Sequence, residues 1–149
     1  MLCERKTETI MPALYPLSLS SFESSDKYTL FHLHCNNITF PLFSPPLPLS
    51  KNDIYNPHEK TSLLSLTYLL PKVLSAKWLQ AVFYACNNNI FSVKIYLSHK
   101  NDNMDNVTEL DIKPSDALVL SLIENIDLYC TDTLVQTLEK EYSSLNSLH

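Results

Sequence analysis

The chain contains no glycine in its 149 residues, and this absence restricts both its turns and its chemistry. Average proteins contain about 7% glycine, which takes positive φ angles without steric cost. P-loops, dinucleotide-binding GxGxxG turns and GxSxG nucleophile elbows all need glycine where the backbone approaches a ligand. The sequence therefore argues against P-loop NTPases, Rossmann dehydrogenases and standard serine hydrolases, and it leaves tight turns to asparagine.

The charge balance limits the partners. Lys and Arg total 11 against 16 Asp and Glu, which gives a formal net charge of −5, and Arg5 is the only arginine. Because neutralising several phosphates requires clustered cations, we expect any nucleic acid to be weakly held.

Four cysteines without a CxxC pair are interpreted as reduced thiols. No segment resembles a signal peptide, and the most apolar run, Leu63 to Leu74, is too short and too polar to span a bilayer. We expect a cytoplasmic protein without a membrane role.

Alternating apolar and polar residues predict antiparallel strands joined by asparagine turns. The first hairpin is expected from Lys27 to Phe43 around Asn36-Asn37, and the second from Leu79 to Ser98 around residues 87–89. After a polar loop from His99 to Asn106, a further strand is expected at Val107 to Ile112, with Leu110 and Ile112 facing inward and Glu109 and Asp111 outward. The proline-rich residues 44–48 are interpreted as a rigid connector.

Helix signals occur at three places. A helix is expected to begin at Thr61 or Ser62, and a buried one follows Lys113-Pro114. After a short strand from Ile126 to Cys130, Thr131 or Asp132 caps a last helix with an apolar stripe. The prediction is one α+β domain, with an antiparallel or mixed sheet built from hairpins and about three helices. It comprises a loose leader (1–13), the domain (14–138), and the end of the last helix with a tail (139–149).

The segment from Val107 to Leu134 resembles the bifunctional nuclease family, in which a strand runs into an Arg-Pro-Ser-Asp-Ala helix followed by a short strand and a closing helix. The residues that match are Asp111, Lys113, Pro114, Ser115, Asp116 and Ala117. Looser similarity extends upstream, so that the resemblance covers about Leu14 to Leu138. It implies an α+β fold and metal-dependent cleavage of DNA and RNA.

The resemblance implies roles for four residues. Asp111 and Asp116 lie five positions apart across a strand-to-helix junction, so both carboxylates are expected to reach one hydrated Mg²⁺ or Mn²⁺. Lys113 would contact a substrate phosphate at the helix N-terminus, and Ser115 would orient it. In the competing interpretation Asp116 and Ser115 serve the helix N-terminus, Lys113 is solvated, and Asp111 has no role.

Other candidates are weighed against structural roles. His32 and His34 share one strand face and would bind a metal with a third ligand such as His58 or His99, although two exposed histidines explain the pattern better. Tyr84, Tyr96 and Trp78 would stack on bases, but packing is the commoner use of aromatic residues in strands.

A non-catalytic interaction or regulatory module that keeps the fold is the alternative function. Where the family has a glutamate the chain has Pro48, and the family's His-Asp pair falls near Leu64 and Ser65. We also predict a homo-oligomer, because open sheet edges and an amphipathic terminal helix need to be covered. The stripe of that helix covers either its own sheet or that of a neighbouring copy, and it comprises Leu134, Leu138, Tyr142 and Leu145.

Overall fold

A computed structural model describes residues 13–47, 71 and 73–146 of the chain, and these form a mixed β-sheet with two helices. The strand order in the sheet is β3-β2-β1-β7-β4-β5-β6, and every neighbouring pair is antiparallel except β4 and β7. The strands are β1 (Leu14–Ser24), β2 (Thr29–Cys35), β3 (Ile38–Ser44), β4 (Ala76–Asn87), β5 (Ile90–Asn101), β6 (Met104–Ile112) and β7 (Asp127–Thr131).

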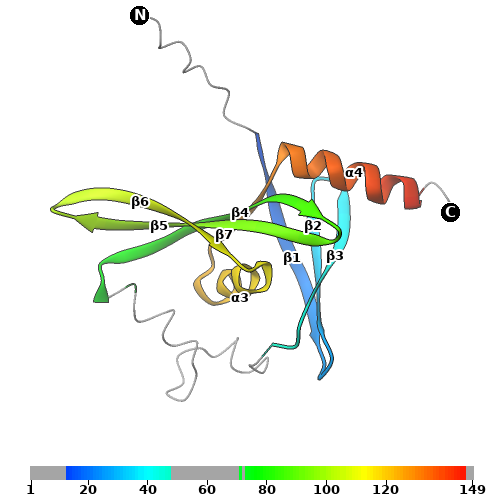
Figure 1. The fold of residues 1–149 in the computed structure, drawn as a ribbon, viewed down its shortest axis with the longest axis horizontal. Coiled ribbons are helices and arrows are strands. Elements are labelled where there is room, and N and C mark those ends of the chain that lie inside the picture. Colours follow the sequence, from blue (N-terminus) through cyan, green and yellow to red (C-terminus); the bar gives the residue numbers. More distant parts are fainter. Residues whose placement is uncertain (1–12, 48–70, 72, 147–149) are drawn as a thin grey trace, which may run out of the picture.

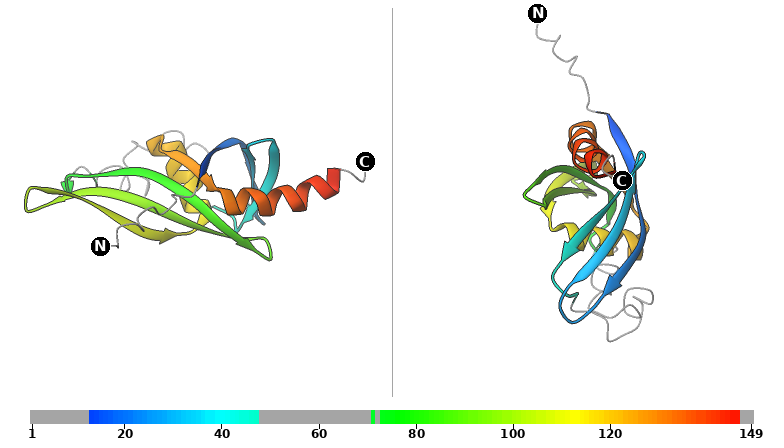
Figure 2. Two further views of the ribbon diagram at one scale, coloured as in Figure 1. Left: turned by 90° about the horizontal axis from the view of Figure 1, so that it is seen from above. Right: turned by 90° about the vertical axis from the view of Figure 1, so that its right-hand side faces the viewer.

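The sheet consists of two three-stranded halves with β7 between them. In Figure 1 the half made of β1, β2 and β3 runs steeply from top to bottom, whereas β4, β5 and β6 run from left to right. The views in Figure 2 show the same crossing of the two halves. Such a strongly twisted sheet encloses a core on its inner face, as expected from the right-handed twist of strands.

Asparagine and aspartate replace glycine at the tight turns. Asn36 joins β2 to β3 with φ 60°, and Asn88 and Asn89 join β4 to β5 with φ 53° and 65°. Asp102 and Asn103 join β5 to β6 in the same way, so the polar loop predicted from His99 to Asn106 is wrong. The two strands instead continue to Asn101 and Met104, and their polar sequence reflects exposure on both faces rather than a loop.

The two described helices are α3 (Pro114–Glu124) and α4 (Asp132–Asn146), against an expectation of about three. The expected start of the further helix, at Thr61 or Ser62, lies outside the described residues. Thr131 caps α4 as predicted, because its Oγ1 accepts a hydrogen bond from the Leu134 amide at 3.3 Å. None of the helices within the described ranges is long and apolar enough to cross a membrane.

Both helices pack on the sheet and share one hydrophobic core with it. α3 contacts β4 and β5, and α4 contacts β1, β3, β4 and β7 (Figure 1). The free thiols of Cys35 and Cys130 contact each other in this core. Side chains with almost no exposure come from both halves of the sheet and both helices, namely Phe31, Phe40, Phe83, Ile95, Leu118, Leu134 and Leu138.

Candidate functional site

Three of the four predicted site residues line one groove at the beginning of α3. Lys113, Ser115 and Asp116 form one side of this hollow, which has a volume of about 440 Å³ and which we call the α3 groove. Its other sides come from segments far away in the sequence. They are the end of β3 with the chain that follows it, Leu42 to Leu47, and the β4–β5 turn, Asn89 to Phe91.

Local sequence explains why α3 begins at this place. Lys113 is the N-cap residue in extended conformation, and Pro114 occupies the first helical position, where its missing amide hydrogen costs nothing. The Lys113 carbonyl accepts the first helical hydrogen bond from the Ala117 amide at 3.0 Å. No described side chain makes a capping hydrogen bond to α3. The first amides of the helix, which have no partner within it, are therefore available to another acceptor.

Asp116 lies in the first turn of α3 with an exposed side chain. Because no described side chain makes a capping hydrogen bond to this helix, the structure does not support the interpretation of Ser115 or Asp116 as a capping residue. The favourable interaction between the Asp116 charge and the helix dipole remains. Lys113, also exposed, brings a cation to the same groove.

Asp111 is placed differently from the other three. It pairs with Lys94 across the β5–β6 ladder and is absent from the lining of the α3 groove. The buried residues of α3 belong to the same core as Val93 and Ile95, the inward-facing neighbours of Lys94. Asp111 and the body of α3 therefore lie on opposite faces of the sheet, and a metal ion shared by Asp111 and Asp116 stays a prediction.

The face that carries Asp111 holds a network of charged and aromatic groups. Lys94 Nζ donates to Glu109 at 2.7 Å and lies 5.2 Å from the centre of the Tyr84 ring, and the Tyr96 hydroxyl donates to Glu109 at 3.1 Å. The hydrogen bond from Lys94 lowers the pKa of Glu109 and raises that of Lys94. Tyr84 and Tyr96 are thus engaged with charged neighbours. Trp78 instead packs against the core.

A large exposed aromatic side chain at the groove was missed by the sequence analysis. Phe43, at the end of β3, is 63% exposed, and Ile90, which also lines the groove, is 71% exposed. The alternation of β3 assigns Phe43 to the outer face, so periodicity indicated exposure but not its nearness to Lys113. That nearness depends on the pairing of distant segments.

A second hollow adjoins the α3 groove. It has a volume of about 310 Å³ and lies between β3, the β4–β5 turn and α4, and we call it the α4 hollow. Three residues, Phe43, Asn89 and Phe91, line both the groove and the hollow. The remaining lining of the α4 hollow consists of Pro41, Cys86, Leu138, Glu141 and Tyr142.

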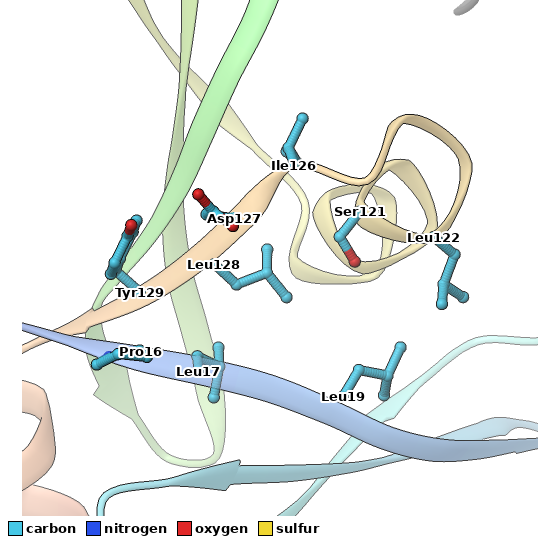
Figure 3. A pocket seen from close by; sticks show the side chains of 9 residues that line it. All are labelled: Pro16, Leu17, Leu19, Ser121, Leu122, Ile126, Asp127, Leu128 and Tyr129. Carbon is cyan, nitrogen blue, oxygen red and sulfur yellow. The ribbon is translucent and has the colours of Figure 1, made fainter.

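Another hollow, of about 420 Å³, lies between β1, α3 and β7. In Figure 3, Leu19, Leu122 and Leu128 border this space from the three elements. Of the described residues that line it, Asp127 is the only charged one and none is a cation. This hollow does not suit a phosphate and contains none of the predicted site residues.

His32, His34 and His99, the histidines that the structure describes, do not assemble into a metal site. His32 Nε2 lies 3.0 Å from a Glu23 carboxylate oxygen, and His34 Nδ1 lies 3.2 Å from the Thr39 hydroxyl. His99 Nε2 is 2.7 Å from the Thr108 hydroxyl, and His58 lies outside the described residues. Within the described part of the chain, no group of three or more His, Cys, Asp or Glu side chains is placed to hold a metal ion.

The α3 groove nevertheless offers donors of the type that Mg²⁺ or Mn²⁺ prefers. Asp116 supplies a carboxylate, and Ser44, Ser115 and Asn89 supply neutral side-chain oxygens. Mg²⁺ in proteins keeps several waters and is commonly held by one or two carboxylates together with substrate phosphates. The donor chemistry fits an ion that arrives with its substrate.

Comparison of the sequence with protein-family models and with curated proteins finds no match.

Proposed function

We propose that this chain binds a phosphodiester of RNA or DNA in the α3 groove and hydrolyses it with the help of a divalent metal ion. The observation that carries the proposal is that Lys113, Ser115 and Asp116, singled out by sequence, line a single groove together. The resemblance to bifunctional nucleases supplies the type of reaction.

The groove contains both positive charge that attracts a phosphate and a hydrogen-bond donor that can orient it. The helix N-terminus carries a partial positive charge and free amides, which favour an anion. The Lys113 ammonium adds a full charge, and the Ser115 hydroxyl is a hydrogen-bond donor that can orient a phosphate oxygen. These groups bind and position the phosphodiester.

Asp116 is the carboxylate of the groove that would hold Mg²⁺ or Mn²⁺. A bound ion of this type supplies activated water and neutralises charge on the phosphate. Asp111 remains the second predicted ligand, although it faces Lys94. The net charge of −5 opposes the approach of a polyanion and keeps the substrate weakly held.

Cleavage of labelled single-stranded RNA and DNA, with Mg²⁺ or Mn²⁺ titrated, tests the proposal. We expect Asp116→Asn and Lys113→Gln to lose most of the activity. Asp105→Asn and Lys100→Gln are the matched controls, because both residues are exposed and lie outside the groove. Unchanged cleavage by folded Asp116→Asn would disprove the assignment.

A specific observation favours a second candidate, the non-catalytic interaction module. Phe43 and Ile90 expose apolar surface at the groove, and Pro45, Pro46 and Leu47 extend that surface. Such a patch is typical of a docking site for a partner. If the purified parent protein cleaves neither RNA nor DNA at any metal concentration, the interaction module becomes the better account.

A further inference from the structure

The α3 groove and the α4 hollow are neighbours with different chemistry. Among the described residues, Lys113 is the only cation that lines either space, and it belongs to the groove together with the Asp116 carboxylate. The described lining of the hollow is mainly apolar and aromatic, and Glu141 is its only charged residue. The cation and the helix N-terminus therefore favour a phosphate in the groove over the hollow, whereas an uncharged planar ring suits the hollow.

Phe43 lines both the groove and the hollow, and most of its side chain is not packed in the core. Its ring is 63% exposed, while Leu42 beside it in β3 is buried with 4% exposure. The Tyr28 ring contacts it at a centroid distance of 5.8 Å and so limits its motion. An exposed aromatic ring that is supported from one side presents a stacking surface.

We infer that the α4 hollow receives one nucleobase, which stacks on Phe43 while the adjoining phosphate lies at Lys113. This inference rests on the proposed function, because the phosphate site is what places the strand. A base within a duplex is already paired and stacked, so it cannot enter the hollow without being flipped out. The protein therefore selects single-stranded over double-stranded nucleic acid.

Binding of three probes at low salt in the presence of Mg²⁺ tests the inference. The probes are a phosphorothioate-linked oligothymidine, an abasic strand of equal length with the same linkage, and the corresponding duplex. Phosphorothioate linkages slow hydrolysis, so that fluorescence anisotropy reports binding alone. We expect the oligothymidine to bind tighter than both others by about 5- to 150-fold, the range for one stacked base.

Variants separate the base site from the phosphate site. Phe43→Ala should weaken oligothymidine binding to the level of the abasic strand, whereas Phe43→Trp should retain it. Val73→Ala is the control, because Val73 is 78% exposed and lines neither space. Lys113→Gln should weaken all probes alike, because it removes a phosphate contact.

The outcomes distinguish the two proposals. Equal affinity of the oligothymidine and the abasic strand, with a loss in Lys113→Gln, would overturn the base site and leave the phosphate site standing. Equal binding by Phe43→Ala and parent would also overturn it, once thermal unfolding shows that the variant is folded. Failure of the parent to bind any probe would overturn both proposals.

Discussion

Asp111 is the cross-strand neighbour of Lys94, and its carboxylate therefore lies on the sheet face opposite to the one that α3 covers. Asp116, five positions later, lines the α3 groove. The two carboxylates differ in environment, since one has a lysine as its ladder partner and the other lies in the first turn of a helix.

This difference predicts unequal effects of the two substitutions on cleavage. We expect Asp116→Asn to lose most of the activity and of the metal affinity, and Asp111→Asn to lose less of both. Isothermal titration with Mn²⁺ together with cleavage rates measures the two effects. Equal losses in both variants would show that the carboxylates share one ion.

The Lys94–Glu109 pair predicts a pH dependence of stability. Its hydrogen bond holds the pKa of Glu109 below the ordinary value of 4.5, so the folded state binds this proton less readily than the unfolded state. The pair therefore contributes to the free energy of unfolding above pH 4.5, and this contribution is lost as the pH falls through the folded-state pKa of Glu109.

Glu109→Gln should abolish this part of the acid dependence. Urea unfolding from pH 3 to pH 7, a range of about four units around the ordinary carboxyl pKa, compares the parent with the variant. The difference in the free energy of unfolding between parent and variant should shrink at low pH, because Glu109 becomes protonated. It should also shrink in high salt, because the pair is exposed and therefore screened. A difference that stays constant with pH would contradict the assignment.

The local sequence pattern predicted much of the fold because asparagines mark the tight turns. Asn36 and the run from Asn87 to Asn89 marked two hairpins that the register confirms. Leu110 pairs with the buried Ile95 on the expected face, but its side chain is 42% exposed. β1 was missed because a bulge between Leu19 and Ser21 breaks its alternation. Leu17 and Phe22 are both buried although they are an odd number of residues apart.

The groove was only half predictable for a similar reason. The groove residues of α3 are adjacent in sequence, from Lys113 to Asp116. Pro114 indicated the strand-to-helix transition at which they lie. The opposite wall comes from β3 and the β4–β5 turn, and only the pairing of strands brings it there. Spacing alone likewise could not reveal that a residue at the end of β6 and one within α3 lie on opposite faces.

The two helix N-termini predict different costs of mutation. Thr131→Ala removes a capping hydrogen bond from α4 and should lower the free energy of unfolding by about 0.5–2 kcal/mol. Asp116→Ala removes only a favourable charge at the dipole of α3 and should cost about 0.3–1 kcal/mol. Denaturant unfolding compares them, with Thr131→Ser as the variant that keeps the cap. A larger cost for Asp116→Ala would indicate a capping role.

Positive φ angles predict where glycine would be tolerated. Asn103 has φ 65° in the β5–β6 turn, far from the α3 groove lining. Asn103→Gly should leave stability unchanged or raise it, whereas Asn103→Val should lower it by about 1–2 kcal/mol or more, because a branched side chain is strained there. Thermal unfolding of both variants checks this. Similar melting temperatures would contradict the turn conformation.

The apolar stripe of α4 predicts the result of truncation. Leu134 and Leu138 are each 1% exposed in the core of their own chain, and the Tyr142 ring lies 6.3 Å from that of Phe40. The stripe therefore covers its own sheet, which is one of the two possibilities that the sequence left open; the side chain of Leu145 lies outside the described part. Truncation before Asp132 should unfold the protein, and Leu138→Ala should cost about 2–5 kcal/mol.

The homo-oligomer itself remains a prediction, and the sheet edges are where it can form. β3 and β6 end the sheet in the described part of the chain, and Pro41 within β3 removes an amide donor from that strand. We therefore expect a second copy to pair along β6, where Val107 is 61% exposed. Val107→Lys should lower the mass in sedimentation equilibrium to that of one chain while the circular dichroism spectrum is retained. A parent that stays monomeric at high micromolar concentration would refute the oligomer, and an oligomer unaffected by Val107→Lys would place the interface elsewhere.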